Sequence, residues 1–208
     1  MNRYVKRTVQ TVVGLAVIGV AGFLTFGPGI VEKGKNTVLA HEPYPVSERA
    51  AALHKTLVIG DWHADSLLWK RDLTKRATRG QVDIPRLQQG NVAIQMFTAV
   101  TKSPKGLNYQ KNSADAADDI TLLAMAQLWP IRTWGSILER ALYQAEKLHG
   151  FQATAPDSLK IIRTRADLNT VLERRKNGES IVGGLLGIEG SHPLEGDLDN
   201  LDRLVGAG

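Results

Sequence analysis

The sequence contains no cysteine among its 208 residues. Disulfides, thiolate metal ligands, thiol nucleophiles and a lipid anchor on cysteine are therefore excluded. A metal site in this protein must use histidine, aspartate or glutamate. The lack of cysteine does not indicate a compartment, because both reducing and oxidising surroundings tolerate a protein without cysteine.

The sequence also lacks a concentration of positive charge on its main part. The net charge is +5 at pH 7, but residues 1–40 contain five basic residues and one acidic residue. The rest of the chain is therefore nearly neutral. A nucleic-acid-binding protein gathers lysine and arginine on a face of its folded domain, near aromatic residues or a recognition motif. The sequence has no such cluster, so we predict no nucleic-acid partner.

Charged residues are absent from residues 8–31. About 20 apolar residues are enough to cross the hydrocarbon core of a bilayer. A basic cluster before such a segment favours the cytoplasmic side, and here the cluster consists of Arg3, Lys6 and Arg7. We therefore predict a single-pass membrane protein with its body on the periplasmic or extracellular side. A cleaved signal peptide is the alternative, because residues 38–40 are similar to a cleavage site.

The composition along the chain predicts three parts. Residues 1–31 form a cytoplasmic stub and a transmembrane anchor, and residues 32–46, which contain glycine and two prolines, form a linker. Residues 47–208 form a folded domain that begins with a short helix capped by Ser47.

Short apolar segments that end in glycine or polar residues predict buried strands in this domain. They lie at residues 56–61, 92–100, 159–162 and 181–188. Helical patterns lie between and after them, at residues 113–149 with a break at Pro130, at 165–176 and at 198–205. Alternating strands and helices predict parallel βαβ units and an α/β fold.

Four such units make about half of a (β/α)8 barrel. The sequence ends at Gly208, where a helix should lead to a fifth strand. On this pattern we expect the chain to be the N-terminal half of a barrel, preceded by a transmembrane helix.

A candidate metal site follows the first predicted strand, in the segment Asp61-Trp62-His63-Ala64-Asp65. Residues i and i+2 of an extended segment point the same way, so His63 and Asp65 should project together toward the mouth of the barrel. An imidazole nitrogen and a carboxylate oxygen suit zinc. The pair alone leaves a chance His-x-Asp in a turn as an open alternative.

A second candidate site follows the last predicted strand, in Gly187-Ile188-Glu189-Gly190-Ser191-His192. A carboxylate at this position faces the same mouth and could bridge two metal ions around a shared hydroxide. By itself Glu189 could equally cap the next helix or lie exposed. His192 could line the site or contact substrate, and a surface role fits its spacing equally well. For the remaining histidines, His41, His54 and His149, we expect structural roles.

Three segments occur in an order that is typical of a known family. They are the segment 61–65 followed by Leu68-Trp69, the block from Asp83 to Phe97, and the segment 187–192. The middle block, which begins Asp83-Ile84-Pro85-Arg86-Leu87, is the most distinctive of the three. On these motifs the chain resembles the membrane (renal) dipeptidase family of zinc metallopeptidases over roughly residues 50 to 208.

The resemblance implies a metal-dependent hydrolase barrel that holds two Zn²⁺ ions and cleaves dipeptides with a metal-activated bridging water. By this similarity His63 and Asp65 match ligands of one zinc, and Glu189 matches the bridging carboxylate. The implied partners are dipeptide substrates, the membrane and, as one option, a second copy in a homodimer. The chain departs from the usual family residues at four positions, where we expect the changes to tune the pocket: Trp62, Ala64, Leu68 and Ser191.

The family takes two further zinc-binding histidines, a substrate-contacting histidine and a catalytic acidic residue from later strands. This chain has no residues there, so we expect no catalytic residue within it and expect the isolated chain to be inactive and poorly folded.

Two other functions stay open on the sequence. One is a different barrel amidohydrolase, such as a deaminase or lactonase. Those enzymes usually carry His-x-His after the first strand, and Asp65 in place of the second histidine argues against them. The other is a non-catalytic, membrane-tethered binding module.

Overall fold

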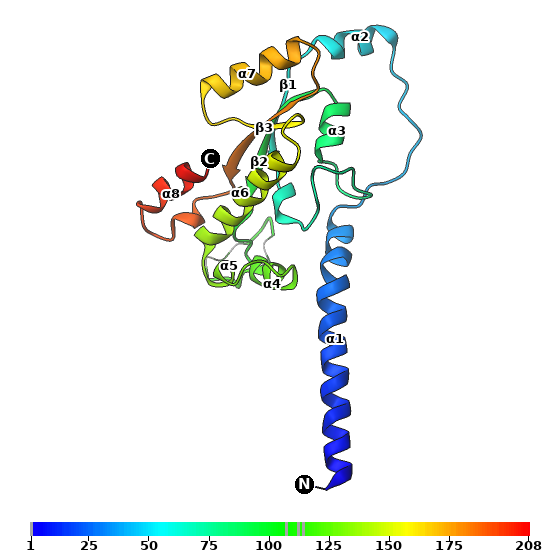
Figure 1. Cartoon of the computed structure of the whole chain (residues 1–208), viewed down its shortest axis with the longest axis vertical. Helices are drawn as coiled ribbons and strands as arrows, with labels where there is room; N and C mark the ends of the chain where they lie inside the picture. Colours follow the sequence, from blue (N-terminus) through cyan, green and yellow to red (C-terminus); the bar gives the residue numbers. More distant parts are fainter. Residues whose placement is uncertain (1, 107, 112, 114) are drawn as a thin grey trace.

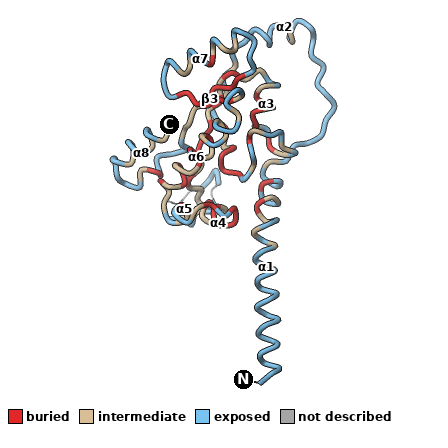
Figure 2. Tube along the Cα trace, viewed as in Figure 1, coloured by how far each residue is buried: buried red, intermediate tan, exposed pale blue. Residues whose placement is uncertain are grey.

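The computed structural model describes residues 2–106, 108–111, 113 and 115–208. A long helix, α1 (Arg3–Lys35), projects from an α/β body (Figure 1). The first two-thirds of the apolar segment of α1 are exposed, as the pale blue trace in Figure 2 shows, whereas its end near Pro28 is buried against the body. By length and composition α1 is able to cross a membrane.

The end of α1 is fixed to the body. Glu32 is only 2% exposed, and its carboxylate forms ion pairs with Arg71 at 2.6 Å and Arg79 at 2.7 Å. The backbone N–H of Gly80 donates to the carbonyl of Asn36 at 3.0 Å. The helix therefore continues into the predicted linker, because two arginines of the body neutralise the carboxylate in its last turns.

A short helix, α2 (Glu48–Thr56), opens the body. The Ser47 hydroxyl caps it by accepting a hydrogen bond from the backbone N–H of Ala50 at 3.2 Å, as predicted.

Four parallel strands form one sheet: β1 (Ile59–Ala64), β2 (Val92–Ala99), β3 (Leu159–Ile161) and β4 (Val182–Ile188). The predicted α/β fold with parallel strands is therefore confirmed. The strand order is β1-β2-β4-β3, so β4 lies beside β2 and β3 lies at the edge. Since β3 has only three residues and pairs with the beginning of β4, the carboxyl edge of the sheet is formed by the other three strands.

The first strand lies three residues later than predicted, so His63 belongs to β1 itself. The pairing of β1 with β2 is irregular between Asp61 and Ala64. An irregularity of this kind changes the direction of a side chain at the end of a strand.

Helices connect and cover the strands. The predicted helix at residues 113–149 is replaced by three shorter ones, with the break at Pro130 confirmed. Asp118 determines where the first of them begins, because its carboxylate accepts from the N–H groups of Ile120 and Thr121. The remaining helices are α3 (Ile84–Gln89), α4 (Asp119–Ala126), α5 (Arg132–Gly135), α6 (Ile137–Thr154), α7 (Arg165–Lys176) and α8 (Asn200–Ala207), with short turns η1 (Ser66–Leu68) and η2 (His192–Leu194).

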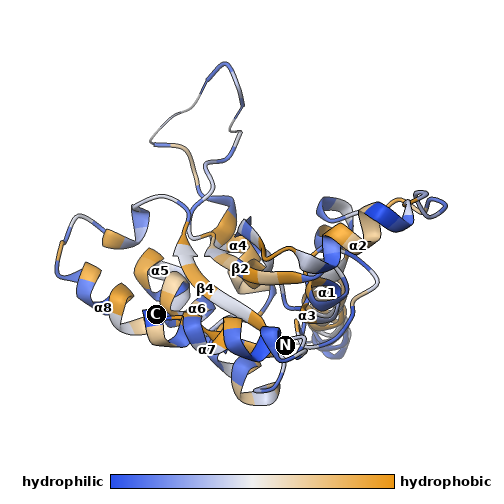
Figure 3. Ribbon diagram, turned by 90° about the horizontal axis from the view of Figure 1, so that it is seen from above, coloured by the Kyte–Doolittle hydropathy of each residue, from blue (hydrophilic) through white to orange (hydrophobic). Residues whose placement is uncertain are grey.

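The main core lies between the sheet, α3 and α6. It joins side chains from β2, β3, β4, η1 and both helices: Leu67, Leu73, Ile84, Leu87, Phe97, Leu148, Leu159, Ile161 and Val182. Figure 3 shows the corresponding apolar colouring of β2 and β4 between the helices. Burial of these side chains, at about 25 cal/mol per Å² of apolar surface, fixes the strands and therefore the residues that follow them.

The distinctive Asp83-to-Leu87 block has a structural role. Asp83 is fully buried and caps α3, accepting from the N–H of Arg86 at 2.9 Å and from that of Ala77 at 3.0 Å. The Arg86 guanidinium forms an ion pair with the same carboxylate. Ile84 and Leu87 belong to the core, so this block holds α3 in place and contributes no group to the carboxyl edge of the sheet.

Candidate metal centre

The carboxyl ends of β1, β2 and β4 bring the predicted ligands together. His63 is the fifth residue of β1, and Asp65 is the first residue after this strand. Glu189 directly follows β4, where its backbone N–H donates to the carbonyl of Ala99 on β2 at 3.2 Å. Because β2 lies between the other two strands and all three are parallel, side chains separated by more than 120 positions meet at one edge.

The three side chains form a compact group. One ligand atom each from His63, Asp65 and Glu189 lies within 4.8 Å of the others. His63 Nε2 is 3.2 Å from Asp65 Oδ1 and 3.8 Å from Glu189 Oε2. The three side chains are 56%, 37% and 54% exposed, so the group is open to an ion or a substrate from solution.

The charge of this group suits a cation. It contains two carboxylates, and in the described residues no lysine or arginine forms an ion pair with either of them. A nitrogen and two carboxylate oxygens are a donor set that zinc accepts. Two carboxylates that converge without a protein cation repel one another, and a bound divalent ion removes this repulsion. The residues present therefore fit a divalent metal ion.

Neighbouring residues hold the ligands in position. The buried Thr98 hydroxyl, on β2, donates to Asp65 Oδ1 at 2.5 Å. The carboxylate of Asp61 accepts from the N–H of His63 at 3.2 Å. Such outer contacts restrict a ligand to one orientation, which is how metal sites keep their geometry.

A buried lysine fixes the turn that follows Asp65. Lys147 of α6 donates to the carbonyls of Leu67 at 2.5 Å and Trp69 at 2.6 Å. Burial lowers the pKa of Lys147 to about 7, while the charge of Glu32 acts in the opposite direction. Because η1 begins at Ser66, this lysine connects the core helix to the segment that carries a candidate ligand.

Two cavities adjoin the group. One, of about 580 Å³, has Asp65 and Glu189 in its lining, and its walls come from α1, α4 and η1. Apolar side chains form most of these walls, and Lys35 and Asp119 add one charge of each sign. The other cavity, of about 310 Å³, lies on the His63 side of Asp65 and extends to Asn36 and Arg71.

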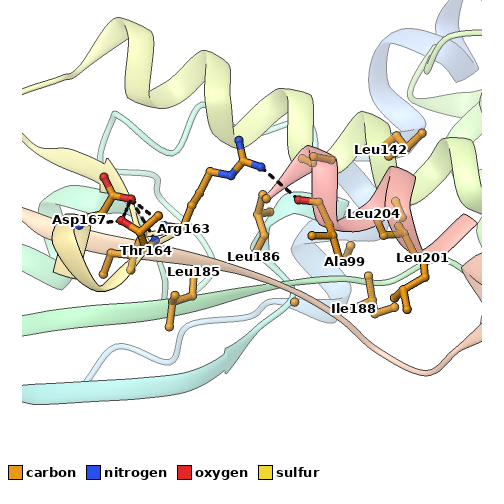
Figure 4. A pocket seen from close by; sticks show the side chains of 17 residues that line it. Ala99, Leu142, Arg163, Thr164, Asp167, Leu185, Leu186, Ile188, Leu201 and Leu204 are labelled. Atoms are coloured by element: carbon orange, nitrogen blue, oxygen red, sulfur yellow. Dashed lines mark hydrogen bonds between the residues drawn. The ribbon is translucent and has the colours of Figure 1, made fainter.

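A larger cavity, of about 700 Å³, lies elsewhere (Figure 4). It separates α8 from β4 and α6, and its lining is mostly aliphatic. Arg163 crosses it and donates to the carbonyls of Val205 and Gly206. It contains none of the three candidate ligands, so we do not place the reaction there.

Comparison with known proteins identifies the family. The family model described as membrane dipeptidase (peptidase family M19) matches residues 47–208. The chain belongs to this family. The predicted resemblance is therefore confirmed, and membership supports a hydrolase of the peptidase class. No curated protein matches the chain.

Among solved structures, the chain is similar to the crystal structure of dipeptidase AC, a metallopeptidase of family M19. The TM-score is 0.51 and the sequence identity 23%. The match covers 74% of this chain and 41% of that one. At this identity the similarity shows the fold alone, and the chain spans less than half the length of that dipeptidase.

The remaining histidines differ in their fit to the predictions. His192 lies in η2, where its ring is beside Gly190, and it is outside the compact ligand group. His149 lies within α6 rather than at its end, and its Nε2 is 2.8 Å from the carbonyl of Ala207. The site residues that sequence reasoning missed are Thr98 and Lys147. A polar residue near the end of an apolar strand was a usable signal for Thr98, whereas nothing local marks Lys147.

Proposed function

We propose that this chain carries the metal-binding part of a membrane dipeptidase, in which His63, Asp65 and Glu189 hold zinc for hydrolysis of the peptide bond of dipeptides. The observation that supports this most directly is the convergence of the three ligand atoms within 4.8 Å of one another. Family membership over residues 47–208 supports the reaction class.

Each residue has a separate part in this proposal. His63 and Asp65 bind one ion, and Glu189 offers a carboxylate that can be shared between two ions. Such ions, when bound, supply Lewis acidity that activates a water molecule and polarises the scissile carbonyl. Thr98 keeps Asp65 turned toward the ion, and Lys147 keeps the η1 turn from moving away from it.

The cavity beside Asp65 and Glu189 is the proposed approach for the substrate. Its mostly apolar walls suit a dipeptide side chain, and Lys35 and Asp119, the charged residues of its lining besides the two candidate ligands, suit the charged ends of a dipeptide. His192, three residues after Glu189, is proposed as a further substrate contact. The anchor α1 places the body at the membrane surface, and Arg3, Lys6 and Arg7 favour a location outside the cytoplasm.

The test is dipeptide hydrolysis by membranes from cells that express the native gene. Three versions are compared: the wild type, Glu189→Gln, and the control Glu173→Gln, whose side chain is 68% exposed on α7. We expect wild type and Glu173→Gln to release free amino acids equally and Glu189→Gln to lose the activity. Equal hydrolysis by Glu189→Gln would exclude the proposed metal centre.

Zinc binding without hydrolysis in all three versions would instead favour the tethered, non-catalytic binding module.

A further inference from the structure

Three exposed apolar residues lie on the part of the body that adjoins α1. Leu122 on α4 is 72% exposed, and Leu128 and Ile131, between α4 and α5, are 58% and 77% exposed. We call these three residues the α4–α5 face. In Figure 1, α4 and α5 form the end of the body that extends toward the middle of α1.

The backbone at Leu128 is unfavourable for a leucine. Its φ is +58°, in the left-handed region that favours glycine. The N–H of Leu128 donates to Met125 at 3.0 Å and that of Trp129 to Ala124 at 2.9 Å, so Leu128 ends α4 at the position where glycine is common. Leu128 keeps 58% of its surface exposed here although its backbone conformation favours glycine. An apolar partner outside the body explains why a leucine is present.

The position of the α4–α5 face along the axis of α1 indicates that the apolar partner is the lipid bilayer. Residues 8–31 carry no charge and span about 36 Å at about 1.5 Å per residue, slightly more than the hydrocarbon core of about 30 Å. The cavity between α1 and α4 is lined on the α1 side by residues from Phe23 to Lys35. Helix α4 therefore lies beside the final part of the uncharged segment, at the level where the outer acyl chains meet the lipid headgroups.

The contact between α1 and the body keeps this level fixed. Glu32 is clamped by Arg71 and Arg79, so α1 is not a flexible tether. The exposed Lys33 and Lys35 lie just beyond the uncharged segment, where lysine interacts with lipid phosphates. Amphipathic surfaces bury their apolar side about 5–10 Å into the boundary between headgroups and acyl chains.

We propose that the α4–α5 face is inserted into the outer leaflet of the membrane, so that the body is held against the bilayer by α1 and by this face together. The inference rests on the membrane-anchoring part of the proposed function. The substrate cavity between α1 and α4 then opens close to the lipid surface.

Single cysteines test this directly, because the sequence contains none. Leu128→Cys and Ile131→Cys carry an environment-sensitive fluorophore in the full chain, reconstituted into phosphatidylcholine and phosphatidylglycerol vesicles. Leu122→Cys replaces either variant if it fails to fold. Leu53→Cys is the matched control, since Leu53 is 61% exposed on α2, at the opposite end of the body (Figure 1). Phe26→Cys reports whether α1 itself is in the bilayer.

We expect nitroxide-bearing lipids to quench labels 26, 128 and 131, with label 53 unaffected, and expect aqueous iodide to quench only label 53. If label 26 is quenched by lipid while 128 and 131 respond to iodide like label 53, the face is in water and the inference is wrong. Shielding of 128 and 131 from both quenchers means contact with a second protein copy, which also overturns it. If label 26 is not quenched by lipid, the membrane anchor itself fails, and the inference fails with it.

Discussion

Asp83 and Asp118 lie against arginines inside the body, whereas Asp65 and Glu189 lie at its surface beside a histidine. The carboxylate of Asp83 is paired with Arg86, and that of Asp118 with Arg140 at 2.5 Å. In the described residues the other two carboxylates have only His63 as a potential cationic partner. The difference separates acidic residues that stabilise the fold from acidic residues that are free to bind a ligand.

Local hydrogen bonds keep Asp118, inside the body, in its charged form. Burial alone would raise the pKa of Asp118, but hydrogen bonds from the Ser103 N–H, the Thr121 hydroxyl and the Arg140 guanidinium lower it below its usual range. An acid with a lowered pKa stabilises the fold above the pKa of the unfolded chain, and this contribution is lost as the pH falls through the folded value. Asp118 is therefore part of the fold at neutral pH.

Removal of Arg140 should have the largest effect on stability. Its guanidinium is 3% exposed, and besides the pair with Asp118 it donates to the carbonyls of Thr101 and Thr133. Arg140→Met leaves the Asp118 charge without its cationic partner, which costs about 3–5 kcal/mol for a buried pair. Chemical denaturation measures the loss. The control Arg132→Met removes a 42% exposed arginine from surface pairs and should cost less than about 1 kcal/mol. Equal losses of unfolding free energy in Arg140→Met and Arg132→Met would contradict the distinction between buried and surface ion pairs.

The exposed acids should show the opposite behaviour. Asp65→Asn removes one of two carboxylates that no lysine or arginine pairs with in the described residues, and the asparagine oxygen can still accept from Thr98. The unfolding free energy without metal should therefore stay within about 0.5 kcal/mol of wild type. Zinc binding, measured by isothermal titration calorimetry on the full chain, should weaken by more than the 10–100-fold that is typical of outer-shell changes. Asp157→Asn, at a side chain that is 98% exposed, should bind zinc as the wild type does. Unchanged zinc affinity in Asp65→Asn would remove this residue from the site.

Much of the fold, and the place of one candidate ligand in it, was predicted from the sequence. Alternating strands and helices predicted the parallel sheet, and the position of Glu189 after an apolar strand predicted its place at the carboxyl edge. The helix at residues 165–176 was predicted with the bounds that the structure has. These features depend on local patterns, namely apolar periodicity, caps and breakers, which act within a few residues.

The features that the sequence did not predict depend on contacts between residues that are distant in the sequence. The order β1-β2-β4-β3 results from packing of whole elements, and the pairing of Glu32 with Arg71 and Arg79 joins segments about 40 residues apart. The block from Asp83 to Phe97 was the most recognisable motif, yet its residues Asp83 to Leu87 fix α3, its end forms most of β2, and none of them belongs to the candidate ligand group. Neither the burial of Asp83 nor the exposure of Asp65 follows from the residue type alone.

Thr98 links the core to the candidate metal site, because this buried residue donates a hydrogen bond to the more exposed Asp65. Thr98→Val keeps the shape of the side chain but removes the hydroxyl that donates to Asp65. We expect zinc affinity to fall about 10–100-fold, that is by about 1.4–2.8 kcal/mol, because Asp65 is no longer held in one orientation. Titration calorimetry measures the affinity. Thr98→Ser should restore most of it, and failure of this rescue would assign the loss to packing instead of orientation.

Asp167 provides the finest test of the comparison, because its side chain is only partly buried, at 23% exposed, and is yet structural. Hydrogen bonds from Thr164 and Lys160 and from the Arg163 N–H lower its pKa to about 2. Its stabilising effect should therefore be complete above the usual aspartate pKa of about 3.9 and be lost as the pH falls toward about 2. In Thr164→Val the first of these hydrogen bonds is absent, so the pKa of Asp167 should rise toward its usual range, as carboxyl NMR titration measures. Thr170→Val, on the same helix, should leave this pKa unchanged. An unshifted pKa in Thr164→Val would mean that exposure, rather than hydrogen-bond partners, decides which acids of this body are structural.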